Sequence, residues 1–108
     1  MLDYLNVLRT FVAVMECGTM AEASRQRRYT AGAVTRQMGW LQQHLGIRLF
    51  EHEGRSIRPT TEAQQLVDAA RSVICEADSF DRNARSLVWV GEKLVPGRAG
   101  PRRTSNGT

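Results

Sequence analysis

Residues 30–46, TAGAVTRQMGWLQQHLG, constrain the fold of this chain more than any other segment. The opening threonine is a good helix cap, and the closing glycine tolerates the left-handed backbone of a helix stop. Between them, four apolar side chains follow at steps of four, three and four residues and so share one helix face: Val34, Met38, Leu41 and Leu45. The opposite face is expected to carry Ala31, Thr35, Arg36, Gln42 and Gln43. The segment therefore predicts a helix with one buried stripe and one polar face.

A second capped segment precedes this helix. In Thr19-Met20-Ala21-Glu22 the threonine oxygen can accept from the amide of Glu22, and the Glu22 carboxylate can reach back to the amide of Thr19, which makes a capping box. The segment then ends in a basic run at residues 25–28. Two short capped helices with basic residues at their junction predict a helix-turn-helix, which places its second helix in the DNA major groove.

One helix is predicted before this pair and a hairpin after it. Between a cap at Asp3 and a stop at Gly18, apolar residues recur at helical spacing: Leu5, Leu8, Val12 and Met15, with Phe11 beside them. After residue 46, β-prone residues 47–52 and 57–59 flank a turn that contains Gly54. A hairpin in this place is the wing of a winged helix-turn-helix, so we expect a mainly α fold of three helices and a β-hairpin wing over residues 1–59.

A long helix is predicted over residues 60–90, with Thr60 or Thr61 as its cap. One seam of alternating four- and three-residue steps runs along it: Leu66, Ala70, Val73, Ala77, Phe80, Ala84 and Leu87. Such a heptad pattern suits helix–helix pairing, and the alternative is packing within one chain only. A helix of about thirty residues exceeds what a small core can cover, which favours dimerisation. Residues 91–108 are rich in Gly, Pro and Arg and predict a disordered tail.

The charge is distributed unevenly along the chain. The formal net charge is +4, and residues 1–60 hold 8 arginines against 5 acidic residues, whereas residues 61–90 hold 3 against 5. A basic N-terminal half favours a polyanionic partner. Cys17 and Cys75 form no CxxC pattern, no apolar run is long enough to span a membrane, and no metal-ligand spacing, phosphate loop or nucleophile–base pair is found. We therefore expect a cytoplasmic, non-enzymatic protein without a metal or cofactor.

Several of these segments together resemble the N-terminal DNA-binding domain of LysR-type transcriptional regulators. The resemblance covers residues 5–87 and is carried by residues 8–14, 16–24, 33–38, 54–55 and 58–60. Its most specific part is Leu45-Gly46-Ile47-Arg48-Leu49-Phe50. It implies a winged helix-turn-helix that dimerises through a long linker helix and binds pseudo-palindromic double-stranded DNA, often as a tetramer. It also implies a C-terminal effector domain, which we expect to be absent because the chain ends about where that domain would begin.

The chain departs from the family pattern at two places. The family commonly has Ser-Gln-Pro at the start of the recognition helix, where this chain has Thr30-Ala31-Gly32. Ala31 lacks the amide with which glutamine reads a base edge, and Gly32 replaces a proline whose backbone is preset for the first helical turn. Arg27 lies where the family usually buries a leucine, and its stem can cover that surface while its head reaches solvent or phosphate.

The residues expected to contact DNA lie on the recognition helix, the junction before it and the wing. They are Thr30, Ala31, Gly32, Thr35, Arg36, Arg27, Arg28, Arg55 and Arg58. Arginine can form a bidentate pair with guanine, which makes residue 36 a candidate base reader, and an arginine at the wing tip can reach the minor groove or backbone. The alternative for each arginine is an ordinary solvated side chain.

Two other functions fit the same sequence. The chain could be a shortened interaction protein that modulates a full-length regulator by heterodimerising through the linker helix, or it could be a non-functional fragment. The main prediction remains sequence-specific binding of double-stranded DNA by a homodimeric or tetrameric transcriptional regulator.

Overall fold

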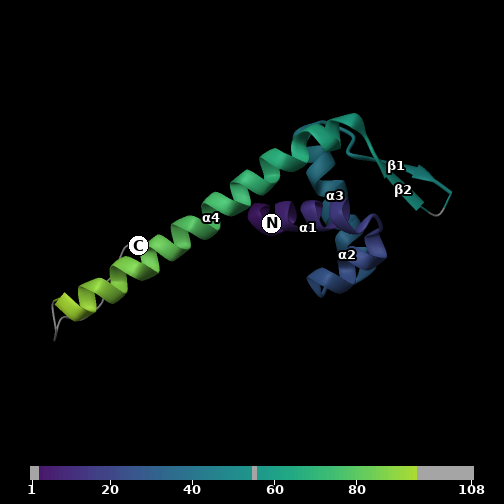
Figure 1. The fold of residues 1–108 in the computed structure, drawn as a ribbon. Helices are drawn as coiled ribbons and strands as arrows, with labels where there is room; N and C mark the ends of the chain where they lie inside the picture. Colours follow the sequence, from purple (N-terminus) through teal and green to yellow (C-terminus); the bar gives the residue numbers. More distant parts are fainter. Residues whose placement is uncertain (1–2, 55, 95–108) are drawn as a thin grey trace. The chain divides into compact units, whose positions relative to one another are not determined.

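The computed structural model describes residues 3–54 and 56–94, with side chains described as far as residue 87. The elements in chain order are α1 (Tyr4–Cys17), α2 (Met20–Arg27), α3 (Ala31–Leu45), β1 (Phe50–Glu53), β2 (Ser56–Pro59) and α4 (Thr61–Leu94) (Figure 1). The chain divides into two compact units, Met1–Ile74 and Cys75–Thr108. The described part of the second unit is the continuation of α4, which extends past residue 90, where the linker helix was expected to end. The remainder of the expected tail, residues 95–108, lies outside the described residues.

Side-chain caps fix where the short helices begin. The Asp3 carboxylate accepts from the amides of Leu5 at 3.1 Å and Asn6 at 3.4 Å, and so begins α1. The Thr19 hydroxyl accepts from the amide of Glu22 at 3.1 Å, which is half of the expected capping box. The other half is wrong, because the Glu22 carboxylate pairs with the guanidinium of Arg25 one turn further on.

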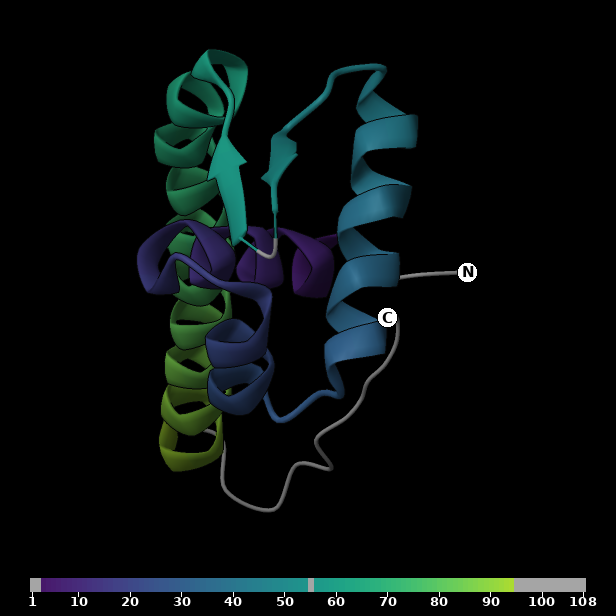
Figure 2. The same cartoon turned by 90° about the vertical axis from the view of Figure 1, so that its right-hand side faces the viewer.

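The core of the first unit is aliphatic, with two phenylalanines. Its buried members are Val7, Phe11, Ala13, Val14, Ala23, Val34, Met38, Leu41, Leu49, Phe50, Ala63, Val67 and Ala70. Helix α1 contacts both α2 and α3, and it crosses α3 at a steep angle (Figures 1 and 2). The buried stripe of α1 is shifted by one residue from the predicted stripe. Val7, Phe11 and Val14 are buried, whereas Leu8, Val12 and Met15 are only half-buried beside this core.

The first unit includes the start of α4, up to residue 74. The Thr60 hydroxyl accepts from the amide of Ala63 at 3.2 Å, which makes Thr60 the cap, and it donates to the carbonyl of Arg48 at 2.7 Å. Ala63, Val67 and Ala70 then face the core. Ala70 is thus a core residue rather than an exposed member of the expected seam, because the first turns of α4 must cover α1 and α3.

The hairpin is antiparallel, and its register pairs Phe50 with Pro59 and Glu53 with Ser56. Phe50 is buried and Ile57 packs against the core, so one face of the hairpin belongs to the core and the other faces solvent. Over the described part of the chain, none of the helices combines the length and the apolar character that crossing a membrane requires.

Candidate nucleic-acid interface

The turn between α2 and α3 is fixed by the backbone. Arg28 caps the end of α2 in the left-handed region with φ 62°, and the amide of Tyr29 donates to the carbonyl of Ser24 at 2.9 Å. The Thr30 hydroxyl then accepts from the amide of Ala33 at 3.1 Å and begins α3, as the sequence predicted. The two helices are in contact, and the short turn joins them as Figure 2 shows.

One face of α3, which we call the free face, is exposed to solvent along the length of the helix. Its exposed members are Ala31, Gly32, Thr35, Arg36, Gly39 and Gln43. The Thr35 hydroxyl donates to the carbonyl of Ala31 at 3.0 Å, which leaves its lone pairs facing outward. Within residues 3–54 and 56–94, no hydrogen bond or ion pair engages the guanidinium of Arg36. The first half of this face therefore presents the hydroxyl of Thr35 and the guanidinium of Arg36, which has no ion-pair partner among the described residues.

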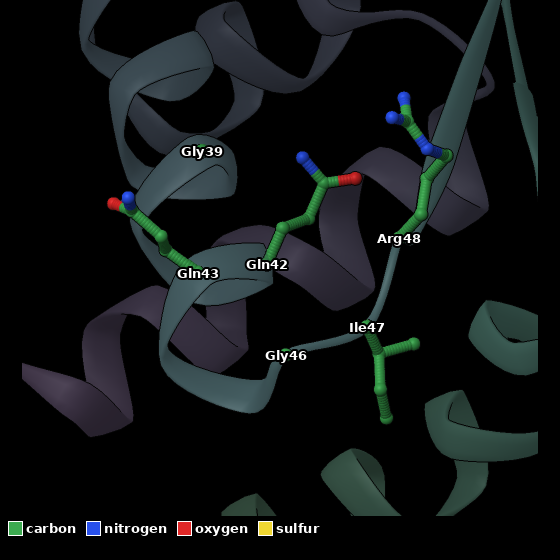
Figure 3. A pocket seen from close by; sticks show the side chains of 6 residues that line it. All are labelled: Gly39, Gln42, Gln43, Gly46, Ile47 and Arg48. Carbon is green, nitrogen blue, oxygen red and sulfur yellow. The ribbon is translucent and has the colours of Figure 1, made fainter.

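The second half of the free face opens into a shallow cavity of about 350 Å³ (Figure 3). It is lined by Gly39, Gln42, Gln43, Gly46, Ile47 and Arg48. Gln42 was expected on the free face, but its side-chain carbonyl accepts from the amides of Leu49 at 2.7 Å and Phe50 at 3.0 Å. Figure 3 shows its amide extending toward the Arg48 segment, whereas Gln43 points to the other side. Gln42 thus ties α3 to the start of the wing.

One lining residue of this cavity, Arg48, is a cation that was not among the DNA contacts predicted from the sequence. Arg48 is exposed and lines the same cavity as Gly39 and Gln43 of the free face. The only sequence signal for it was its position in the motif that joins the third helix to the wing. Arg28, which was selected, is exposed at the end of α2.

Arg27 has a structural role that the sequence did not indicate. Its guanidinium donates to the carbonyl of Asn6 at 3.2 Å and to the hydroxyl of Thr10 at 3.2 Å, both on α1. Its Cζ also lies 5.3 Å from the centre of the Tyr29 ring. These bonds direct the head of the side chain toward α1, so Arg27 has a structural role here, and its phosphate contact stays a prediction.

Arg58 on the wing also has partners within the protein, in ion pairs at the surface. Its guanidinium lies 3.6 Å from a Glu51 carboxylate oxygen and 3.1 Å from a Glu53 carboxylate oxygen. The side chains of all three residues are more than half exposed. Arg55, the expected wing-tip contact, lies outside the described residues.

The expected pairing seam of α4 divides between the two units. In the first unit Leu66 and Ala70 line a cavity of about 140 Å³ with residues of α1 and α3, and Val73 at its rim is 49% exposed. In the second unit Phe80 is 72% and Leu87 is 73% exposed. Ala77 is half-buried and Ala84 is exposed. Large apolar side chains at this exposure favour a partner, although the pairing itself stays a prediction.

Two contacting helices joined by a tight turn, with a free face on the second and a two-stranded hairpin after it, define a winged helix-turn-helix protein. The chain belongs to the LysR family. The model of the family described as bacterial regulatory helix-turn-helix protein, lysR family, matches residues 5–64.

Individual relatives agree with this assignment. The HTH-type transcriptional regulator TfdS of Cupriavidus pinatubonensis is 40% identical over 87 residues, which is 79% of this chain and 30% of that protein. The regulator TrpI of Pseudomonas aeruginosa is 35% identical over 81 residues, or 75% of this chain and 25% of that protein. This chain thus spans less than a third of either relative.

Solved structures show the same fold. The crystal structure of a CbnR DBD–DNA complex has a TM-score of 0.73 and 30% identity, and the match covers 77% of this chain and 95% of that chain. The crystal structure of a BenM DBD complex with catB site 1 DNA has a TM-score of 0.72 and 26% identity, with 77% and 93% coverage.

Proposed function

We propose that this chain binds double-stranded DNA in a sequence-specific manner and regulates transcription, with α3 lying in the major groove. The single observation that carries the proposal is the free face of α3, which is exposed and begins at the helix-turn-helix junction. An α-helix with one uncovered polar face fits the width of the major groove. The similar CbnR and BenM domains were solved as DNA complexes, which supports DNA binding by this domain.

Base reading on this face rests mainly on Arg36. Thr30 already serves as the cap of α3, and Ala31 and Gly32 carry no polar side-chain atom. The hydroxyl of Thr35 can accept from a base or approach a phosphate, and the guanidinium of Arg36 can form a bidentate pair with guanine. We therefore propose that Arg36 supplies most of the base discrimination, with Thr35 as its neighbour.

Phosphate contacts supply the rest of the affinity. Arg28 at the junction and Arg48 beside the cavity are exposed cations on the elements that border the free face. We propose both as backbone contacts, together with Arg55 of the wing. We propose Arg58 as a weaker contact, because its ion pairs with Glu51 and Glu53 compete with phosphate. Neutralising phosphates releases counterions, so binding is expected to weaken steeply as salt increases.

The exposed apolar residues of α4 support a homodimer. Phe80 and Leu87 are seven positions apart and so lie on nearly the same side of the helix. We propose that the α4 helices of two copies pair through these side chains and hold two α3 helices for two half-sites. A mixed dimer with a full-length regulator is the alternative, and co-expression with such a regulator followed by analysis of dimer composition distinguishes the two.

The proposal is tested by selecting duplexes from a random pool and measuring their affinity by fluorescence anisotropy over a range of salt concentrations. We expect enrichment of a two-fold-related sequence and a steep decrease of affinity with salt. Recovery of no preferred sequence, with affinity independent of salt, would refute the proposal.

A further inference from the structure

The outer face of the wing carries an ion-paired cluster of one cation and two anions. Register pairs Glu51 with Arg58 directly across the hairpin, and strand alternation places Glu53 on the same face. Phe50 and Ile57 lie on the opposite face, toward the core. The guanidinium of Arg58 is therefore flanked by two carboxylates, with the shorter contact, 3.1 Å, to Glu53.

This arrangement is unusual for a surface that approaches DNA. The three side chains together carry a net charge of −1, although the wing was expected to offer cations to the phosphates. Exposed ion pairs are weak and exchange readily, so a phosphate can displace the carboxylates from Arg58. The displacement nevertheless breaks both ion pairs, which lowers the net gain from a phosphate contact by Arg58.

We propose that Glu53, assisted by Glu51, restrains Arg58 and thereby lowers the affinity of the wing for DNA. The inference rests on the proposed function, because it concerns the strength of binding at the same interface. Glu53 acts through Arg58 and so is a positioning residue. The restraint lowers the share of binding that is independent of sequence, since Arg58 then contributes little to phosphate contact.

The test is a double-mutant cycle on a duplex that the wild-type chain binds. Glu53→Gln keeps the size of the side chain and removes its charge, and it is expected to tighten binding about two- to fivefold. The freed Arg58 should also steepen the salt dependence toward one more released counterion, a change of about 0.9 in slope. Arg58→Gln alone should change the affinity little, because the wild-type guanidinium is already engaged.

The double-mutant cycle distinguishes restraint of Arg58 by Glu53 from direct repulsion between the Glu53 carboxylate and DNA. If Glu53 acts through Arg58, then Glu53→Gln has no effect in the Arg58→Gln background. Equal tightening in both backgrounds would mean that the carboxylate repels DNA directly, and an unchanged affinity in both would mean that it does not act at all. Either result overturns the proposal.

Two controls show whether a change in affinity is due to unfolding of the hairpin, and whether a negative result concerns the restraint or DNA binding itself. Glu16→Gln removes the same charge from an exposed carboxylate that pairs with Arg71 at 3.4 Å, outside the wing, and should leave affinity unchanged. Thermal unfolding of each variant shows whether the hairpin remains folded. If neither the wild type nor the Glu16→Gln control binds any duplex, the proposed function fails. If both bind and Glu53→Gln does not differ from them, only the restraint fails.

Discussion

Replacing Gly39 by alanine should stabilise the protein. Gly39 lies in the interior of the 15-residue helix α3, and a Cβ built there meets nothing within 4 Å. The added methyl therefore causes no clash, and the gain is the difference in helix propensity, about 1 kcal/mol. For a domain of this size that corresponds to an increase in Tm of about 4–8 °C.

The matched control is the same substitution at the end of the same helix. Gly46 has φ +69°, a left-handed conformation that alanine adopts at a cost of about 1–2 kcal/mol, so Gly46→Ala should lower Tm although its Cβ also meets nothing within 4 Å. Thermal unfolding followed by circular dichroism at 222 nm measures both variants. If Gly39→Ala leaves Tm unchanged or lowers it, or if the two variants shift Tm in the same direction, the reasoning from backbone conformation is refuted.

Three further substitutions test the assigned contacts. Gln42→Ala removes the acceptor of the Leu49 and Phe50 amides and should cost about 1–3 kcal/mol of unfolding free energy, so an unchanged urea midpoint would contradict its bridging role. Phe80→Asp should convert the dimer to a monomer in sedimentation velocity, and a dimer that persists would argue against pairing through α4. Arg27→Ala should lower stability by about 1 kcal/mol without changing the salt dependence of DNA binding, whereas a shallower salt slope would restore the phosphate contact that the structure argues against.

The sequence was sufficient for the elements that local chemistry determines. Thr19, Thr30 and Gly46 carry caps and stops that act within a few residues, and the hairpin follows from β-prone residues around a glycine turn. The fold class could be inferred because these signals occur in the order of a winged helix-turn-helix. The buried stripe of α3 was also predicted, since that helix has a single covered face.

Contacts between elements could not be predicted in the same way. Helix α1 is apolar on several sides, so its spacing alone did not show that Val7 and Val14, rather than Leu8, would be fully covered. Two polar side chains make contacts that the sequence did not indicate, because their partners are distant in sequence or unmarked by it: Gln42 and Arg27. A basic or amide side chain on a helix or strand has the same sequence signature whether it binds a ligand or its own protein.

The measurement that tests the central claim most directly is the affinity of Arg36→Ala for a selected duplex. If α3 reads the major groove through this guanidinium, the variant should bind about 5- to 150-fold more weakly and lose preference at one base pair of each half-site. Arg71→Ala removes the same charge from an ion-paired position on α4 and should weaken binding less than about twofold. Equal losses for the two variants, or a full base preference retained by Arg36→Ala, would contradict the assignment of α3 as the reading helix.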